Sequence, residues 1–186
     1  MIAVEPQPEL ARYLRSLYAS TKNVTVMHGA VGESVGEITL HIPGDGPSHG
    51  ATIREIDSRE GGAIRDVRVP CFTLGAIAEE HGLERLDFIK CDAEGAERAI
   101  FDGGRDALER FKPCVLVECE RRHAGGVDPV GELWSIFETL GYEGHCFCGG
   151  RMIPIDGFDY DTHQTDPADK PNYGNNFFFT HPDRTA

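Results

Sequence analysis

The sequence is poor in positive charge. Its 18 lysines and arginines stand against 31 aspartates and glutamates, so the 186 residues carry a formal net charge of −13. Binding to a phosphate backbone or to an anionic membrane requires a positive protein surface. We therefore expect neither nucleic acid nor membrane among the partners of this protein.

Long apolar runs are also missing. No stretch approaches the roughly 20 apolar residues of a membrane-spanning helix, and no charged and then apolar leader opens the sequence. These features predict a cytoplasmic protein. Apolar residues make up 40% of the chain, which is enough for one core, and no shift in composition divides it. We expect a single domain over residues 1–186.

Cysteine pairs at zinc-binding spacing are scarce. Among six cysteines only Cys146 and Cys148 are close in sequence, beside His145, and no second pair completes a structural zinc site. Cys91 and Cys119 lie in or beside apolar runs, where cysteine usually behaves as a small hydrophobic residue. We expect reduced thiols and no metal held by cysteine.

The sequence alternates between strand-like and helix-like segments. The expected strands are 1–4, 24–28, 36–42, 67–70, 86–91, 114–119, 144–147 and 176–180, and the expected helices are 8–19, 74–80, 96–110 and 130–140. This order favours an α/β fold with a mostly parallel sheet, helices on both faces and an antiparallel edge. A glycine-rich stretch at 29–36 is followed by a strand rather than a helix, so we interpret it as a hairpin-type turn.

One segment is especially informative. Residues Leu86 to Glu97 read L-D-F-I-K-C-D-A-E-G-A-E, an apolar strand that runs into carboxylates. Ligands of open α/β sheets bind beyond the carboxyl ends of the strands, where Asp92, Glu94 and Glu97 are expected. A structural alternative is that Asp92 caps the next helix while the two glutamates complement its dipole. The spacing alone does not choose between these readings.

This segment resembles the central motif of the FkbM-type S-adenosylmethionine-dependent methyltransferases, D-F-I-K-(I/L)-D-(V/A)-E-G-A-E. Four further segments support the resemblance in the same order: I-A-V-E-P at 2–6, N-V-T-V at 23–26, V-L-V-E at 115–118 and N-N-F-F-F at 175–179. The resemblance covers nearly the whole chain and implies a Rossmann-like methyltransferase fold.

The resemblance also implies that a part of the family's domain is missing. Residues 2–5 correspond to the family's second strand, so its first strand, glycine-rich turn and first helix are absent from this sequence. In the family's arrangement that strand is central, and its loss would leave two strand edges unpaired. Either the fold compensates, for example through a partner chain such as a second copy that covers these edges, or the chain is a truncated product. We also expect S-adenosylmethionine to bind weakly or not at all without the turn.

The resemblance assigns cofactor contacts to two strand ends. Glu5 ends the first strand, where an acid in nucleotide-binding folds accepts hydrogen bonds from ribose hydroxyls. His28, Gly29 and Ala30 end the next strand, where the family's backbone approaches the adenine. Asp92 is a further candidate for cofactor contact. The alternatives are a solvated acid at Glu5 and a core histidine at His28.

The candidate catalytic residues are acids and a histidine. Glu118 and Glu120 face the same side of their strand and, with Asp92 and Glu94, are expected to form an acidic pocket floor. Methyl transfer to a hydroxyl requires a base or a metal to take the proton. His123 is the candidate neutral base. Asp92 and Glu118 could instead hold Mg²⁺, but two strand ends supply few oxygen ligands, so we favour a metal-free site.

Three functions remain open at this point. The resemblance implies an S-adenosylmethionine-dependent O-methyltransferase that acts on a hydroxyl of a sugar, glycolipid or secondary metabolite. The alternative is a non-catalytic, truncated or degenerate domain with a structural or assembly role. A metal-dependent hydrolase is disfavoured because a dense histidine and aspartate signature is lacking. His49, in a glycine-rich loop, is a lower-ranked candidate base.

Overall fold

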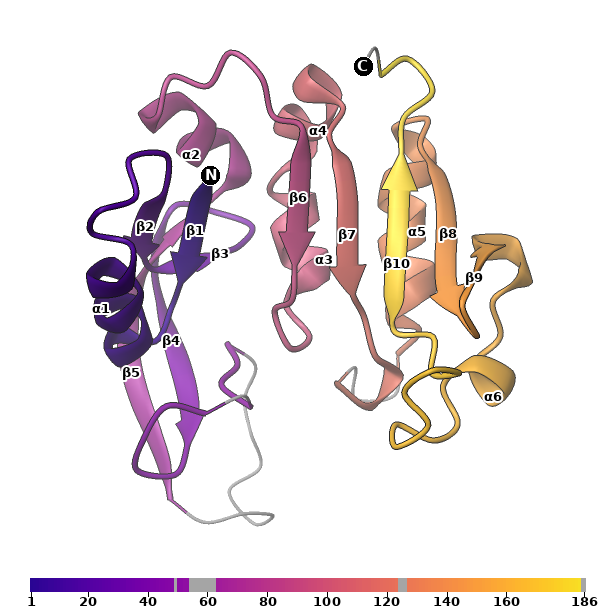
Figure 1. Ribbon diagram of the computed structural model, residues 1–186, viewed down its shortest axis with the longest axis horizontal. Helices are drawn as coiled ribbons and strands as arrows, with labels where there is room; N and C mark the ends of the chain where they lie inside the picture. The colour runs from indigo at the N-terminus through magenta and orange to yellow at the C-terminus, as the bar shows by residue number, and fades with distance from the viewer. Residues whose placement is uncertain (49, 54–62, 124–126, 185–186) are drawn as a thin grey trace.

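A computed structural model describes residues 1–48, 50–53, 63–123 and 127–184 (Figure 1). The strands are β1 (Ile2–Glu5), β2 (Thr25–His28), β3 (Ala30–Val31), β4 (Gly36–Pro43), β5 (Ile64–Phe72), β6 (Phe88–Cys91), β7 (Cys114–Glu118), β8 (Glu143–Cys148), β9 (Arg151–Pro154) and β10 (Asn176–Thr180). The helices are α1 (Pro8–Leu17), α2 (Leu74–Glu80), α3 (Glu97–Asp102), α4 (Arg105–Phe111), α5 (Pro129–Thr139) and α6 (Tyr160–His163), with 3₁₀ turns η1 (Arg121–His123) and η2 (Ile155–Gly157).

The strands form three hydrogen-bonded sheets. Their orders are β6-β7-β10-β8-β9, β3-β5-β4 and β1-β2. The β1–β2, β3–β5 and β6–β7 pairs are parallel, and the remaining four pairs are antiparallel. The predicted α/β class is confirmed, but a mostly parallel sheet is not. The reason is that β10 enters between β7 and β8 against their direction, and β4 doubles back on β5.

β1 and β6 are two of the six described strands that have a single hydrogen-bonded neighbour. β1 pairs with β2, and β6 pairs with β7. Figure 1 shows that β1 and β6 point in the same direction. The expected unpaired strand edges are thus present, while their coverage by a second copy of the chain stays a prediction.

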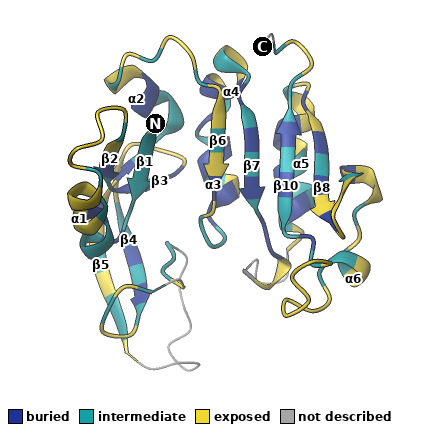
Figure 2. Cartoon of the chain, viewed as in Figure 1, coloured by how far each residue is buried: buried dark blue, intermediate teal, exposed yellow. Residues whose placement is uncertain are grey.

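The main core lies between the five-stranded sheet and its helices. Phe177 and Phe179 of β10 are fully buried, and Phe179 stacks on Phe137 of α5 with ring centroids 4.0 Å apart. On the other face Phe88 and Phe147 are each 51% exposed. Figure 2 shows buried and intermediate residues along β7 and β10, and exposed residues in β6 and β8. Burial on one face therefore orders the sheet and positions the strand ends that carry the candidate site.

The helix after the motif is shorter than expected. The sequence pattern predicts one helix to about residue 110, but the helix breaks into α3 and α4 at Gly103 and Gly104. A Cβ at Gly103 would lie 2.5 Å from the Cα of Glu33. This close approach requires glycine, and paired glycines weaken a helix. The contact also holds the segment before β4 against the motif helix.

The interpretation of residues 29–36 as a hairpin-type turn is wrong. β3 and β4 do not pair with each other, because β5 lies between them. Gly32 donates its backbone N–H to the carbonyl of Phe72 at 2.9 Å, which continues the parallel β3–β5 pairing. The expected extended piece at 67–70 is in fact part of the longer strand β5. No helix among the described residues has the length and apolar character needed to cross a membrane.

Candidate active site

The motif strand and its neighbour bring two predicted acids to the same edge of the sheet. β6 and β7 run parallel with Cys91 opposite Val117, so Asp92 directly follows one strand and Glu118 ends the other. Lys90 Nζ lies 3.8 Å from Asp92 Oδ2 and 4.0 Å from Glu118 Oε2. One ammonium group therefore faces both carboxylates.

A third acid completes this group, which we call the carboxylate cluster (Asp92, Glu118 and Glu120). Asn175 Nδ2 donates to Glu118 Oε1 at 2.7 Å and to Glu120 Oε1 at 3.0 Å. Asn175 directly precedes β10, whose first residue, Asn176, is paired with Glu118. The antiparallel entry of β10 thus brings an amide from the end of the chain to the carboxylates.

Glu120 is buried, with 7% of its surface exposed, and is held by several donors. Arg122 donates to both of its oxygens, and the Tyr173 hydroxyl donates to Oε2 at 3.1 Å. Burial would raise the pKa of Glu120, but the hydrogen bonds from Arg122 and Asn175 outweigh it and lower that pKa. Glu120 is therefore both buried and paired in charge with Arg122.

Glu118 has the opposite electrostatic environment. Burial, and next the negative charge of Asp92, raise its pKa above the ordinary value of 4.5, while Lys90 partly offsets this. The two glutamates of the cluster thus differ in how readily they take up a proton. A pair of carboxylates with separated pKa values is typical of sites that carry out acid–base chemistry.

The turn between β6 and α3 is closed by Glu97 rather than by Asp92. Glu97 Oε1 accepts the backbone N–H groups of Ala93 at 3.2 Å and Gly95 at 3.0 Å, and the residue is 6% exposed. The N-cap of α3 is Ala96, which makes no side-chain cap. The capping role considered for Asp92 is therefore wrong, and the architectural role belongs to Glu97.

Glu94 occupies a strained position in the same turn. Its φ of 49° lies in the left-handed region, which is uncommon for residues other than glycine. Thr52 Oγ1 donates to the Glu94 carbonyl at 3.1 Å, so a residue from the chain after β4 stabilises the turn between β6 and α3. The pKa of Arg122 is raised mainly by its hydrogen bonds to Glu120, and the negative charge of Glu94 makes a smaller contribution in the same direction. Glu94 therefore lies within electrostatic range of the carboxylate cluster.

The predicted cofactor residues other than Asp92 lie at the ends of β1 and β2 and the start of β3. Glu5 is paired with His28, and Gly29 donates its N–H to the Glu5 carbonyl at 3.1 Å. Glu5 Oε1 accepts the Gln7 N–H at 2.8 Å, yet burial raises the pKa of the carboxyl. Ala30 is buried in β3.

One polar atom of these predicted cofactor residues has no partner. His28 Nε2 is buried and makes no hydrogen bond in the described part of the chain. Such an atom costs free energy unless a ligand or a water satisfies it. The core-histidine alternative for His28 would require a satisfied ring, which the structure does not show at this nitrogen.

Two candidate bases are not tested by the structure. His123 belongs to η1, but its side chain lies outside what the structure describes, and His49 lies outside the described residues altogether. Their roles remain predictions. Among the described residues, no group of three or more histidine, cysteine, aspartate or glutamate side chains is arranged to hold a metal ion.

Sequence reasoning missed three donors of the cluster. The sequence places Asn175 only in the N-N-F-F-F segment, indicates no role for Tyr173, and predicts Arg122 only as part of a surface turn of charges paired with Glu120. Tyr173 is 53 residues from Glu120 in sequence, so no local spacing signals their contact. A buried carboxylate needs hydrogen-bond donors, so the proximity of Arg122, two residues from Glu120, is the sequence feature that indicates their pairing.

Known proteins resemble this chain in sequence and in structure. The family described as "Methyltransferase FkbM domain" matches residues 1–143. The structure is similar to the crystal structure of methyltransferase FkbM from Methylobacillus flagellatus KT, with a TM-score of 0.56 and 16% identity over 96% of this chain. The chain spans 36% of the length of that protein. No curated protein matches the sequence.

Proposed function

Because the chain belongs to the FkbM methyltransferase family, we propose that it transfers a methyl group from S-adenosylmethionine to a hydroxyl of a sugar, glycolipid or secondary metabolite. The observation that supports this most is the placement of Asp92 and Glu118 at adjacent ends of parallel strands, with Lys90 between them. Both acids fall within the region that matches the family.

The residues at the ends of β1 and β2 fit the nucleoside part of the cofactor. One Glu5 oxygen accepts the Gln7 N–H, and the other makes no hydrogen bond with a described residue, so it can accept from ribose hydroxyls. The unpartnered His28 Nε2 lies in the residue paired with Glu5 and would gain a partner from a bound ligand. When bound, S-adenosylmethionine supplies a methyl group on a positively charged sulfur.

Glu118 is the proposed proton acceptor. When the cofactor is bound, the Glu118 carboxylate would take the proton of the acceptor hydroxyl whose oxygen receives the methyl group. Its raised pKa makes it a better base than an ordinary glutamate. Asn175 orients it at 2.7 Å, and Glu120, held ionised by Arg122, keeps Asn175 in place.

The chemistry of the same residues favours a metal-free mechanism. Mg²⁺ would need the oxygens of Asp92 and Glu118. Lys90 Nζ already stands 3.8 and 4.0 Å from those carboxylates, and a divalent cation there would be repelled by the ammonium group. We therefore propose that Lys90, rather than Mg²⁺, balances the charge of the cluster.

Mass spectrometry of acceptor mixtures tests the proposal. The full chain is incubated with S-adenosylmethionine and hydroxylated sugars, glycolipids or metabolites, and products are identified by the mass of an added methyl group. We expect Glu118→Gln to lose about 100-fold in rate or more, as for removal of a general base. Glu109→Gln, an exposed glutamate of α4, is the matched control and should keep full activity.

Two outcomes would change the proposal. Cofactor binding without transfer to any acceptor would favour the non-catalytic alternative. Inhibition by a chelator that added Mg²⁺ reverses would overturn the metal-free mechanism. His123→Gln is made in parallel, and a loss of rate there with full activity in Glu118→Gln would move the base to His123.

A further inference from the structure

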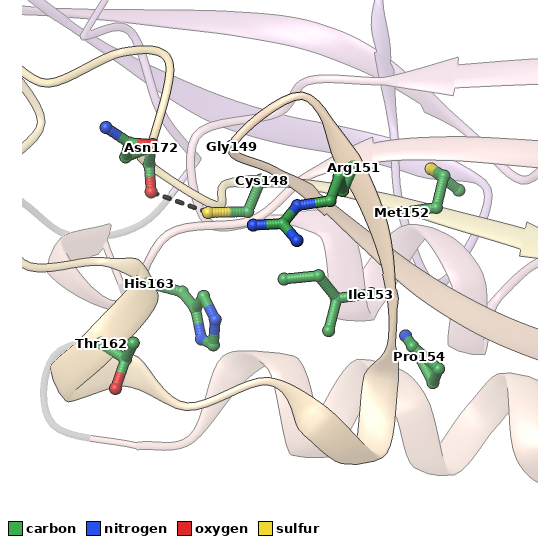
Figure 3. Close-up of a pocket in the computed structure, with 9 residues that line it drawn as sticks. All are labelled: Cys148, Gly149, Arg151, Met152, Ile153, Pro154, Thr162, His163 and Asn172. Carbon is green, nitrogen blue, oxygen red and sulfur yellow. Dashed lines mark hydrogen bonds between the residues drawn. The ribbon is translucent and has the colours of Figure 1, made fainter.

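A cavity of about 490 Å³ lies between the β8–β9 turn and the segment that contains α6. Its volume falls in the range of small-molecule sites, roughly 300–1,000 Å³. None of the predicted site residues lines it. Its walls include Cys148, Arg151, Ile153, Pro154, His163 and Asn172 (Figure 3). Apolar walls with a few polar groups are typical of sites that bind small molecules.

An arginine and a histidine face the cavity. Figure 3 shows the guanidinium of Arg151 and the ring of His163 turned toward the same space. The side chain of Arg151 makes no ion pair or hydrogen bond with any residue that the structure describes. His163 Nδ1 lies 3.0 Å from both the backbone nitrogen and the carbonyl oxygen of Asp159, so it can accept from the first or donate to the second. Arg151 is therefore the group that supplies unpaired donors at this cavity.

The neighbouring acids do not neutralise Arg151. Asp159 accepts the hydroxyl of Thr162 at 2.8 Å, and Asp169 accepts both contacts of the Asn172 amide at 3.1 and 2.9 Å. Neither acid forms an ion pair with the guanidinium. In a chain of net charge −13, an arginine without a carboxylate partner at a cavity is an available anion-binding group.

The cavity wall is continuous with the carboxylate cluster through the chain before β10. Cys148 Sγ donates to the Asn172 carbonyl at 2.8 Å, which fixes this wall to β8. The next residue, Tyr173, donates to Glu120 at 3.1 Å. One short segment therefore lines the cavity on one side and supports the proposed catalytic acids on the other.

We propose that this cavity binds the anionic group, a carboxylate or a phosphate ester, of a sugar-type acceptor, and that Arg151 determines this specificity. The planar guanidinium pairs with either anion through two parallel hydrogen bonds. Ile153 and Pro154 provide apolar contact for the sugar ring. That the bound sugar is the methyl acceptor rests on the proposed function, but the binding of the sugar is measured independently of turnover.

Isothermal titration calorimetry tests this inference on the full chain. The probes are glucuronate, glucose 6-phosphate and neutral glucose, without S-adenosylmethionine. We expect at least one charged sugar to bind and glucose to bind at least tenfold more weakly. Arg151→Gln should weaken the charged sugar by about tenfold or more, and Arg151→Lys should recover only part of the loss. The charged sugar that binds identifies the anion as carboxylate or phosphate.

The matched control is Arg12→Gln. Arg12 is an exposed arginine of α1, so this variant changes the net charge equally without touching the cavity. The proposal is overturned if neither charged sugar binds, if glucose binds equally well, or if Arg12→Gln weakens binding as much as Arg151→Gln. Melting curves confirm that each variant is folded. Absent methyl transfer with intact, Arg151-dependent binding would count against the proposed function alone.

Discussion

The side-chain amide of Asn175 donates to the carboxylate of Glu118, with Nδ2 2.7 Å from Oε1. This contact joins the start of the last strand, β10, to the end of β7, two elements that are far apart in sequence. Since the same amide also reaches Glu120, it holds together two acids whose pKa values are shifted in opposite directions. The site therefore contains one acid suited to taking up a proton and one that stays ionised.

The stability of a Glu118→Gln variant should depend on pH. The folded-state pKa of Glu118 is raised above 4.5, so ionising it in the folded protein costs free energy at pH 7. We expect the neutral variant to be more stable than the parent at pH 7, by up to about 1 kcal/mol since the side chain is partly exposed. The gain should vanish below pH 4.5, where Glu118 is protonated in both states. Urea unfolding at several pH values measures it, and an equal effect in Glu109→Gln would contradict the assignment.

Arg122→Gln should destabilise the protein through Glu120. The variant leaves a buried carboxylate without its charged donor, which costs about 1.5–3 kcal/mol at pH 7. The pKa of Glu120 is lowered in the folded state, so this stabilisation is present above pH 4.5 and is lost as the pH falls through the folded-state pKa. The difference between variant and parent should shrink accordingly in acid.

Arg68→Gln is the control for this prediction. Arg68 and Glu37 are 4.0 Å apart with side chains 77% and 64% exposed, so their pair should contribute little. Equal melting temperatures of Arg122→Gln and Arg68→Gln would show that Glu120 does not depend on its arginine.

The sequence predicted the strand ends well and the donors around them poorly. Strand alternation and the motif placed Asp92 and Glu118 at one edge, and that placement follows from local pattern alone. The contact of Asn175 with Glu118 spans 57 residues and depends on β10 entering antiparallel beside β7. No local period encodes this pairing. For the same reason the mostly parallel sheet was expected, whereas the structure is mixed.

Glycine packing was the second source of error. The break between α3 and α4 arises because Gly103 meets the Glu33 backbone, a contact between segments 70 residues apart in the chain. Helical periodicity continues across this break, so the pattern predicts one helix. In contrast, α2 begins and ends as expected. The Thr73 hydroxyl accepts the Ala76 N–H at 3.1 Å, and this local contact caps the start of the helix.

Glu5→Ala should weaken S-adenosylmethionine binding. The loss of a charged acceptor for ribose hydroxyls is worth about 1.5–3 kcal/mol, or roughly tenfold or more in affinity. Because burial raises the pKa of Glu5, affinity should also fall as the pH approaches that pKa from above. Calorimetry at two pH values measures both effects. Glu37→Ala, an exposed acid on β4, is the control, and an unchanged dissociation constant in Glu5→Ala would restore the solvated-acid reading.

Variants of Asp92 and Glu97 should distinguish a catalytic role from a structural role within one turn. Asp92→Asn keeps the size of a side chain that is 51% exposed and caps no helix, so we expect little change in melting temperature and a tenfold or greater loss of cofactor binding or turnover. Glu97→Ala removes the acceptor of two partly buried N–H groups and should cost about 1–3 kcal/mol of stability. Glu97→Gln keeps one acceptor oxygen and should lie between Glu97→Ala and the parent. If Asp92→Asn instead melts several degrees lower and keeps full activity, Asp92 has a structural role and the carboxylate cluster is not the catalytic site.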